Sequence, residues 1–181
     1  DNIINSVLID SFNIIGKKLN SKKLEGLAKD LGELMIARNL SFTSAESCTG
    51  GWIGQTVTAI PGSSKWFGVG FITYSNVAKA KFLRVSEDSL RNYGAVSEQV
   101  VEEMVKGAIL ESKADLGVAI SGIAGPGGGT KKMPVGTVCM AWKFNDVLIS
   151  TTKFFEGDRN QVRYSTVEHV FLKAIELLNN N

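Results

Sequence analysis

The chain has 181 residues, 44% of them hydrophobic and 21% charged, and its 20 Lys and Arg residues against 18 Asp and Glu residues leave a net charge of +2. This composition indicates a globular chain of one domain and excludes intrinsic disorder. So small a net charge gives no reason to expect nucleic acid or a membrane as the main partner, and no apolar run approaches the roughly 18 residues that cross a bilayer. No secretory signal is recognisable, and Cys48 and Cys139 are too few for a disulfide framework. We therefore expect reduced thiols in a cytoplasmic protein.

Hydrophobic periodicity predicts two helices at the start of the chain. Residues 1–19 carry apolar side chains at helical spacing. A second stripe, which ends near Asn39, consists of Leu24, Leu27, Ala28, Leu31, Leu34 and Met35. We assign residues 1–22 to an N-terminal helical extension and residues 23–181 to a single domain.

Strand-like and helix-like segments then alternate along the chain. The predicted strands are 40–46, 66–74, 116–123, 135–144 and 147–155, and the predicted helices start at Trp52, Asn76 and Glu98 and cover the C-terminal stretch around 167–178. The run 116–123 is apolar throughout, which is typical of a strand covered on both faces. The last two strands are expected to pair through a turn at Asn145-Asp146. This order predicts a single three-layer α/β/α domain with a mixed sheet.

The first candidate site is the segment Ala45-Glu46-Ser47-Cys48-Thr49-Gly50-Gly51, which lies between a predicted strand and a predicted helix. Ligands of α/β proteins bind at the carboxyl ends of strands, and the N–H groups that open a helix favour negative charge, including a developing oxyanion. The alternative is an ordinary helix N-cap, for which Ser and Thr are also preferred. The G-x-S-x-G nucleophile pattern is absent.

A serine nucleophile requires a base, and the sequence offers few. The single histidine, His169, lies off the apolar stripe of the last predicted helix, so we expect it in water and expect no Ser-His-Asp triad. Lys79 is the candidate base, with a pKa lowered by burial or by a neighbouring cation, and Tyr74 could relay a proton. The alternative for Lys79 is a solvated helix lysine. Cys48 is the rival nucleophile, but without a histidine partner a small buried thiol is the better interpretation.

Two further segments could contact an anionic ligand. The glycine-rich loop Ser121-Gly122-Ile123-Ala124-Gly125-Pro126-Gly127-Gly128-Gly129-Thr130 follows a predicted strand but matches neither G-x-G-x-x-G nor the P-loop, so a phosphate cradle and a mobile surface loop both remain open. Arg159 and Arg163 are four residues apart at the start of the last helix and could bind a phosphate. Their alternative is a solvated face or an ion pair with Asp158 or Glu156.

Six motifs occur together in one order: Ala-Glu-Ser-Cys-Thr-Gly-Gly at 45–51, Thr-Tyr-Ser-Asn followed by Lys79, Gly-Ala-Val-Ser-Glu at 94–98, the glycine-rich loop at 121–130, Pro-Val-Gly-Thr-Val at 134–138 and Gly-Asp-Arg at 157–159. In this combination the chain resembles the CinA C-terminal-domain family over roughly residues 24–178. One departure is Met133, which separates Lys132 from Pro134 and affects the expected position of Lys132.

The resemblance implies hydrolysis of the carboxamide of nicotinamide mononucleotide to nicotinate mononucleotide and ammonia, in pyridine-nucleotide recycling in the bacterial cytoplasm. It also implies an α/β/α fold, no metal or cofactor, a small-molecule nucleotide as partner and commonly a homodimer. Ser47 resembles the nucleophile and Lys79 the base, while Tyr74 and Ser64 resemble the hydroxyl groups around them. The expected substrate-binding residues are Thr49, Gly50, Gly51, Ser121, Gly122, Gly125 and Arg159, with Arg163 added on its spacing alone.

The sequence leaves two other functions open. A non-catalytic nucleotide-binding or regulatory module of the competence-damage-inducible type would keep the pocket without the reaction; the presence of Ser47, Tyr74 and Lys79 together argues against it. A scaffold in DNA uptake or repair would need a basic face, which the net charge of +2 does not favour.

Overall fold

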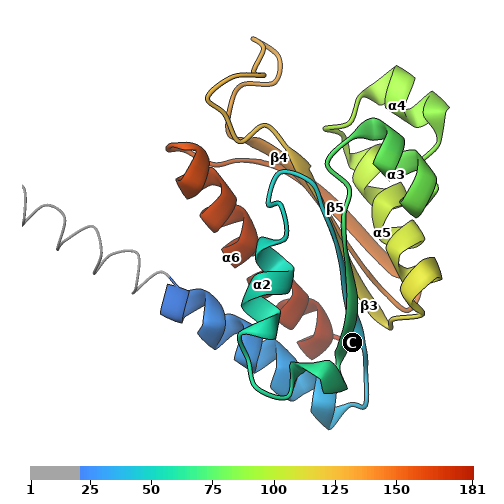
Figure 1. The fold of residues 1–181 in the computed structure, drawn as a ribbon, viewed down its shortest axis with the longest axis vertical. Helices are drawn as coiled ribbons and strands as arrows, with labels where there is room; N and C mark the ends of the chain where they lie inside the picture. Colours follow the sequence, from blue (N-terminus) through green and yellow to red (C-terminus); the bar gives the residue numbers. More distant parts are fainter. Residues whose placement is uncertain (1–20) are drawn as a thin grey trace, which may run out of the picture.

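The computed structural model describes residues 21–181, so the predicted extension lies outside the described residues except for its last two positions (Figure 1). A five-stranded sheet in the order β2-β1-β3-β4-β5 forms the centre of the molecule. Two strand pairs, β1 with β2 and β1 with β3, are parallel, and two, β3 with β4 and β4 with β5, are antiparallel, so the prediction of a mixed sheet is confirmed. The strands are β1 (Phe42–Glu46), β2 (Phe67–Ile72), β3 (Leu116–Gly122), β4 (Thr137–Phe144) and β5 (Val147–Phe154).

Helices cover both faces of the sheet, which confirms the predicted three layers (Figure 1). On one face lie a helix over 21–37, α2 (Trp52–Thr58) and α6 (Arg159–Asn179), and on the other lie α3 (Asn76–Leu83), α4 (Glu87–Tyr93) and α5 (Glu98–Ser112). A short 3-10 helix, η1 (Ser63–Lys65), precedes β2. The sequence did not predict α4 because it has no buried residue and therefore no apolar stripe.

The two faces of the sheet differ in side-chain size. On β3, Leu116, Val118 and Ile120 belong to the core beneath α6, whereas Ala119 belongs to the core beneath α5. Small side chains let α5 approach the sheet closely: a Cβ added at Gly117 would lie 2.7 Å from the Ile109 side chain. The full burial of both faces of β3 confirms the prediction from its apolar run.

The fold brings three chain segments to one edge of the sheet. Because β1, β2 and β3 are parallel, Ser47 and Thr73, which follow β1 and β2, and Gly122, which ends β3, meet at the carboxyl ends of these strands. The N-terminus of α6 reaches the same edge, since Arg159 bonds to the Gly125 carbonyl. This is where the candidate residues were expected.

His169 does not lie in water, so that expectation was wrong. Its ring is half-buried against Trp142 and Phe155, with ring centroids 5.9 Å and 6.2 Å away, and burial lowers its pKa. The apolar surface of α6 extends further round the helix than the stripe suggested. His169 remains on the face opposite α3, which carries Lys79, so it does not supply a base to Ser47.

Within residues 21–181, no helix is long and apolar enough to cross a membrane. The same residues contain no group of three or more His, Cys, Asp or Glu side chains arranged to hold a metal ion.

Candidate functional site

Ser47 directly follows β1 in a tight turn, residues 47–51, which we call the Ser47 turn. Its N–H donates to the Ile120 carbonyl at 3.0 Å, so the chain stays beside β3, and the N–H of Gly50 closes the turn on the Ser47 carbonyl at 3.0 Å. Gly50 and Gly51 adopt φ values of 61° and 96°, a left-handed conformation that glycine tolerates best. The turn therefore holds Ser47 at the sheet edge with its side chain almost enclosed.

Lys79 meets Ser47 at the centre of the site. Its Nζ lies 3.0 Å from Ser47 Oγ and donates to the Thr73 carbonyl at 2.8 Å. The side chain is only 2% exposed, so Lys79 is not the solvated lysine that the sequence left open. Burial lowers the pKa of Lys79 and is the main influence on it, with an opposing contribution from the Cys48 thiol. The structure thus pairs a buried amine with a serine hydroxyl.

Cys48 is not available as a nucleophile. The side chain is buried in the core beneath α6, and burial raises the pKa of its thiol to about 12. A thiol with this pKa is almost fully protonated at neutral pH, and the thiolate is the reactive form. The interpretation of Cys48 as a small buried thiol is confirmed.

Glu46 is a residue whose role the sequence analysis missed. Its buried carboxylate accepts hydrogen bonds from the backbone N–H groups of Gly51, Ile53 and Gly54 at 3.0–3.1 Å. The first N–H groups of α2 are therefore not open to a ligand, contrary to our expectation for this helix start. The only sequence signal is an acid placed before a helix that has no side-chain cap of its own. Glu46 anchors the far end of the Ser47 turn.

Thr49 lies within the turn and is fully buried. Its Oγ1 has no hydrogen-bond partner within residues 21–181, and neither has Oγ1 of Thr73 beside Lys79. Buried hydroxyl groups are normally paired, so two unpaired ones around a buried Ser-Lys pair mark a place where a ligand or water would complete the bonding.

Arg159 joins three segments at the mouth of the site. Its Nη1 donates to the Gly125 carbonyl at 2.7 Å and its Nη2 donates to the Tyr74 hydroxyl at 2.8 Å. Tyr74 is 61% exposed and contacts Arg159 rather than Lys79. The neighbouring Asp158 caps α6 by accepting from the N–H groups of Asn160 and Gln161. Arg159 therefore holds Tyr74 and the glycine loop together at the surface.

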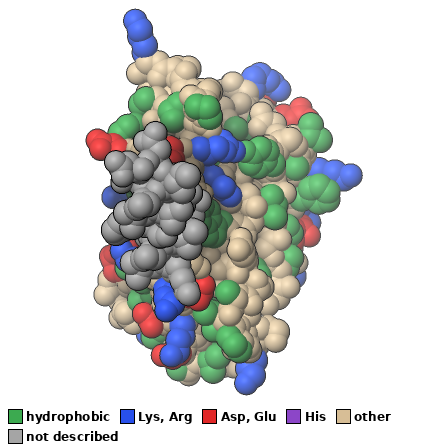
Figure 2. Space-filling model, turned by 60° about the vertical axis from the view of Figure 1, so that its left-hand side comes forward, with side chains coloured by type: hydrophobic (Ala, Val, Ile, Leu, Met, Phe, Trp, Pro, Cys, Tyr) green, Lys and Arg blue, Asp and Glu red, His purple; other side chains and the backbone are tan. Residues whose placement is uncertain are grey.

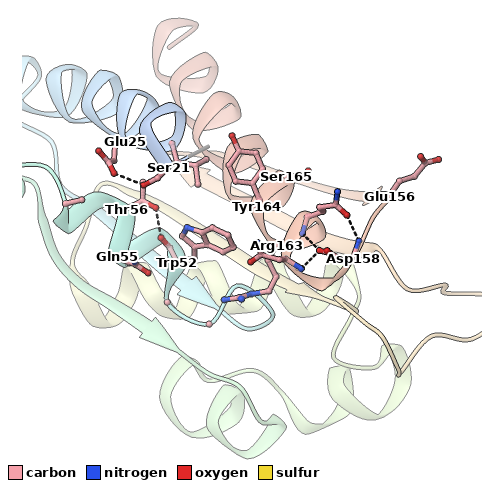
Figure 3. A pocket seen from close by; sticks show the side chains of 16 residues that line it. Ser21, Glu25, Trp52, Gln55, Thr56, Glu156, Asp158, Arg163, Tyr164 and Ser165 are labelled. Carbon is pink, nitrogen blue, oxygen red and sulfur yellow. Dashed lines mark hydrogen bonds between the residues drawn. The ribbon is translucent and has the colours of Figure 1, made fainter. Parts of the chain in front are cut away.

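Arg163, one turn further along α6, contacts the backbone of the Ser47 turn. Its Nε donates to the Cys48 carbonyl at 3.0 Å and its Nη2 donates to the Thr49 carbonyl at 2.7 Å. The guanidinium stacks over Trp52, with 5.1 Å from its carbon to the ring centroid (Figure 3). Arg163 therefore neither lies on a solvated helix face nor forms an ion pair with Asp158 or Glu156.

The glycine loop, residues 122–135, follows β3. Ser121 is 2% exposed at the end of the strand. Gly122 and Gly125 are required for packing, because an added Cβ would lie 2.8 Å from the Val138 side chain and 2.5 Å from the Val135 side chain, respectively. Residues 126–132 are exposed, and the Thr130–Met133 hydrogen bonds form a local turn around the unexpected Met133.

Comparison with known proteins identifies the family of the chain. The model of the CinA C-terminal domain matches residues 24–178. The chain belongs to the CinA C-terminal domain family. It is 47% identical over 146 residues to the nicotinamide-nucleotide amidohydrolase PncC of Escherichia coli K12 (80% of this chain, 88% of that protein) and 49% identical over 141 residues to PncC of Pseudomonas putida (78% and 88%). A crystal structure of a CinA superfamily protein from Klebsiella pneumoniae superposes with a TM-score of 0.84 at 34% identity, covering 87% of this chain and 99% of that one.

Ser64 does not join the other candidates in this member of the CinA C-terminal domain family. It is exposed in η1, directly before β2, where the Trp66 carbonyl pairs with the N–H of Phe42 at the start of β1. A strand of this length rises about 15–20 Å, so Ser64 lies at the opposite edge of the sheet from Ser47. Ser64 was assigned from the family resemblance, and its place before β2 puts it at the amino end of that strand.

A cavity of about 990 Å³ lies beside the Ser-Lys pair, and neither Ser47 nor Lys79 lines it. It opens between the helix over 21–37, α2 and α6, and Arg163, Gly50 and Gly51 form one of its walls (Figure 3). Three carboxylates line it, those of Glu25, Glu156 and Asp158, which makes it unsuited to a phosphate. On the face in Figure 2, Lys and Arg side chains are interspersed with Asp and Glu, without a broad basic area.

Proposed function

We propose that the protein hydrolyses the carboxamide of nicotinamide mononucleotide to nicotinate mononucleotide and ammonia, with Ser47 as nucleophile and Lys79 as base. The observation that carries the proposal is the 3.0 Å separation between Lys79 Nζ and Ser47 Oγ, with Lys79 buried. Relatives at 47–49% identity that are named nicotinamide-nucleotide amidohydrolase support the choice of substrate.

The first half of the reaction forms an ester on Ser47. As Oγ attacks the carboxamide carbon, its proton passes to the lone pair of neutral Lys79, and the carbonyl oxygen becomes an oxyanion. The ammonium of Lys79 then gives the proton to the amide nitrogen, the C–N bond breaks and ammonia leaves. Lys79 is neutral again, and the substrate carbonyl is bound to Ser47 as an acyl-enzyme.

Water completes the cycle by the same route. It attacks the ester carbon while Lys79 takes one of its protons, and Lys79 returns that proton to Oγ as the C–O bond to Ser47 breaks. The product leaves as a carboxylic acid and ionises in water. Each proton that Lys79 accepts is given back, so the enzyme ends as it began.

The surroundings of Lys79 suit it to this task. One N–H of the amine donates to the Thr73 carbonyl, which leaves the lone pair free to accept from the Ser47 hydroxyl. Burial lowers the pKa of Lys79, so a larger fraction of the amine is neutral at the pH of the cell than in an exposed lysine.

The oxyanion needs a donor that the protein does not already use. Glu46 occupies the N–H groups of Gly51, Ile53 and Gly54. Within residues 21–181, no acceptor is recorded for the N–H groups of Cys48 and Thr49. The Thr49 N–H, two residues after Ser47, is turned away from α6 because the Cys48 carbonyl bonds to Arg163. We assign it to the oxyanion, with the unpaired Thr49 hydroxyl available to the same substrate.

The phosphate of the nucleotide is assigned to the exposed mouth of the site. Arg159 retains N–H groups beyond the two bonded to Gly125 and Tyr74, and the Tyr74 hydroxyl, which accepts from Arg159, can donate its own proton to a phosphate oxygen. Gly122, Gly125 and Ser121 line the same edge. We therefore place Tyr74 in nucleotide binding, since its hydroxyl contacts Arg159 rather than Lys79.

Release of ammonia from nicotinamide mononucleotide, followed by a coupled assay, tests the proposal. We expect turnover in the wild type and none in Ser47→Ala, with nucleotide affinity retained. Tight binding of the nucleotide by wild-type protein without any ammonia would instead identify a non-catalytic binding module. A homodimer and a cytoplasmic location stay predictions, and light scattering of the purified protein checks the first.

A further inference from the structure

Arg163 and Arg159 lie on one face of α6 but bond to different parts of the protein. Arg159 reaches the exposed mouth of the site, whereas both hydrogen bonds recorded for Arg163 go to backbone carbonyls of the Ser47 turn. Trp52 holds the guanidinium plane from one side. These contacts hold the Arg163 guanidinium against the protein itself, which argues against a role in phosphate binding.

Because the peptide bond is planar, the contacts of Arg163 with two carbonyl groups also fix the direction of the N–H groups that follow them. In a trans peptide the C=O of one residue and the N–H of the next point in opposite directions. The Thr49 carbonyl points at Arg163, and the N–H of Gly50 accordingly points away from it and bonds to the Ser47 carbonyl. The Cys48 carbonyl also points at Arg163, so the N–H of Thr49 is turned away from α6. Away from α6 is the side of the sheet on which α3 carries Lys79.

We propose that Arg163 is a positioning residue that orients the Cys48–Thr49 peptide so that the Thr49 N–H faces the oxyanion. This inference rests on the proposed amide hydrolysis and replaces our prediction that Arg163 binds the substrate. A guanidinium is suited to this positioning role because two of its nitrogens, held in one plane, donate to two neighbouring carbonyls at once. The single ammonium of a lysine lacks this fixed geometry. Arg163 acts through the backbone and does not touch the substrate.

The test separates a positioning effect from a loss of binding. In Arg163→Ala we expect kcat to fall about 10- to 100-fold with KM unchanged, because a misdirected donor weakens only the transition state. The matched control is Arg159→Ala, four residues earlier on the same helix, in which KM for the mononucleotide rises. A KM increase for the mononucleotide but not the riboside in Arg163→Ala would overturn the proposal and make Arg163 a phosphate ligand.

Chemical rescue provides a readout that a general loss of stability would not change. The cavity of about 990 Å³ that Arg163 lines gives guanidinium ion access to the vacated position. We expect added guanidinium, at concentrations below those that unfold the protein, to restore kcat of Arg163→Ala at least several-fold, and sodium chloride or urea to restore none. Absence of rescue in a folded Arg163→Ala protein contradicts the proposal. Should that variant not fold, Arg163→Lys takes its place, with a smaller kcat loss and unchanged KM expected.

A second readout does not depend on the identity of the substrate. A fluorophosphonate probe reacts with an activated serine through a transition state whose oxygen also occupies the oxyanion site. We expect labelling of Ser47, located by mass spectrometry, to slow in Arg163→Ala and to remain at the wild-type rate in Lys173→Ala, which removes only an ion pair with Glu176 further along α6. If wild-type protein is labelled but releases no ammonia from the mononucleotide, the proposed substrate fails and the role of Arg163 is still decided. Equal labelling rates in wild type and Arg163→Ala overturn the inference.

Discussion

The Ser47 turn and the glycine loop meet at the same edge of the sheet but are held very differently. Residues 47–51 are fixed from three sides, by Glu46 on the N–H groups, by Arg163 on the carbonyls and by Lys79 on the Ser47 hydroxyl. Residues 126–132 of the glycine loop are exposed, and the hydrogen bonds recorded for them join only Thr130 to Met133. In the proposed function, bonds are made and broken in the firmly held region, and the open region binds the nucleotide.

This contrast makes a general prediction about substitutions. Changes in the Ser47 turn and its supports should lower kcat, because catalytic groups must be held to within fractions of an ångström. Changes on the side of the glycine loop should raise KM, because those groups contact a part of the substrate that does not react. Substitutions of Ser47, Lys79, Glu46 and Arg159 test this division between effects on kcat and effects on KM.

Ser47→Ala should abolish turnover. Loss of a nucleophile commonly lowers kcat by about four orders of magnitude or more, and the residual rate comes from positioning and oxyanion stabilisation. A coupled ammonia assay measures the loss, and isothermal calorimetry should show nearly unchanged affinity for the nucleotide. Cys48→Ser is the matched control with a mild effect. An active Ser47→Ala protein combined with an inactive Cys48→Ser protein would reverse the assignment of the nucleophile.

Lys79→Arg should be nearly inactive although it keeps the positive charge, because a guanidinium stays protonated and cannot accept the Ser47 proton. We expect a loss of about three orders of magnitude in kcat. In the wild type, the reaction needs neutral Lys79, so activity should rise as pH increases through its lowered pKa. His169→Ala is the control: it should retain activity and this pH profile while losing thermal stability, since its ring packs on Trp142. Substantial activity in Lys79→Arg would require another base.

Glu46→Gln should lower both stability and kcat. The amide offers one acceptor oxygen where the carboxylate satisfies three backbone N–H groups, so at least one buried donor loses its partner. We expect about 1–3 kcal/mol less stability in urea unfolding and about tenfold lower kcat, with KM unchanged. Ser44→Ala, which removes only the weaker 3.4 Å contact to the same carboxylate, is the control with a much smaller effect. A rise in KM alone would place Glu46 outside the support of the turn.

Arg159→Met should weaken the mononucleotide more than the riboside, which lacks the phosphate. A charge-assisted contact to a phosphate is worth roughly 1.5–3 kcal/mol, or about one to two decades in KM. Steady-state kinetics with both substrates gives the comparison, and Tyr74→Phe should show the same preference to a smaller degree. Equal losses for the two substrates would show that Arg159 only ties Tyr74 to the glycine loop.

The sequence predicted local features well and contacts between distant segments poorly. The strands and the position of Lys79 near Ser47 follow from short patterns and from the rule that carboxyl ends of parallel strands meet. The contacts of Arg163 join residues 115 and 114 positions apart, and no periodicity encodes them. The same limit explains Glu46, whose carboxylate bonds are invisible in the order of residues.

Two errors have a simple physical origin. Ser64 was assigned to the site from the family resemblance, but it precedes β2 whereas Thr73 follows it, so the two residues lie at opposite ends of the strand. His169 was placed in water because it lies off the regular stripe of α6, whereas the large rings of Trp142 and Phe155 extend the contact surface beyond that stripe.

The most direct test of the account is capture of the acyl-enzyme. Wild-type protein mixed with excess nicotinamide mononucleotide and quenched in acid within the first turnovers should carry the mass of the nicotinate mononucleotide acyl group on the peptide that contains Ser47. The adduct should be absent from Ser47→Ala and greatly reduced in Lys79→Arg. An adduct on Cys48 or another residue, or ammonia release at full rate by Ser47→Ala, would contradict the assignment of Ser47 as the nucleophile.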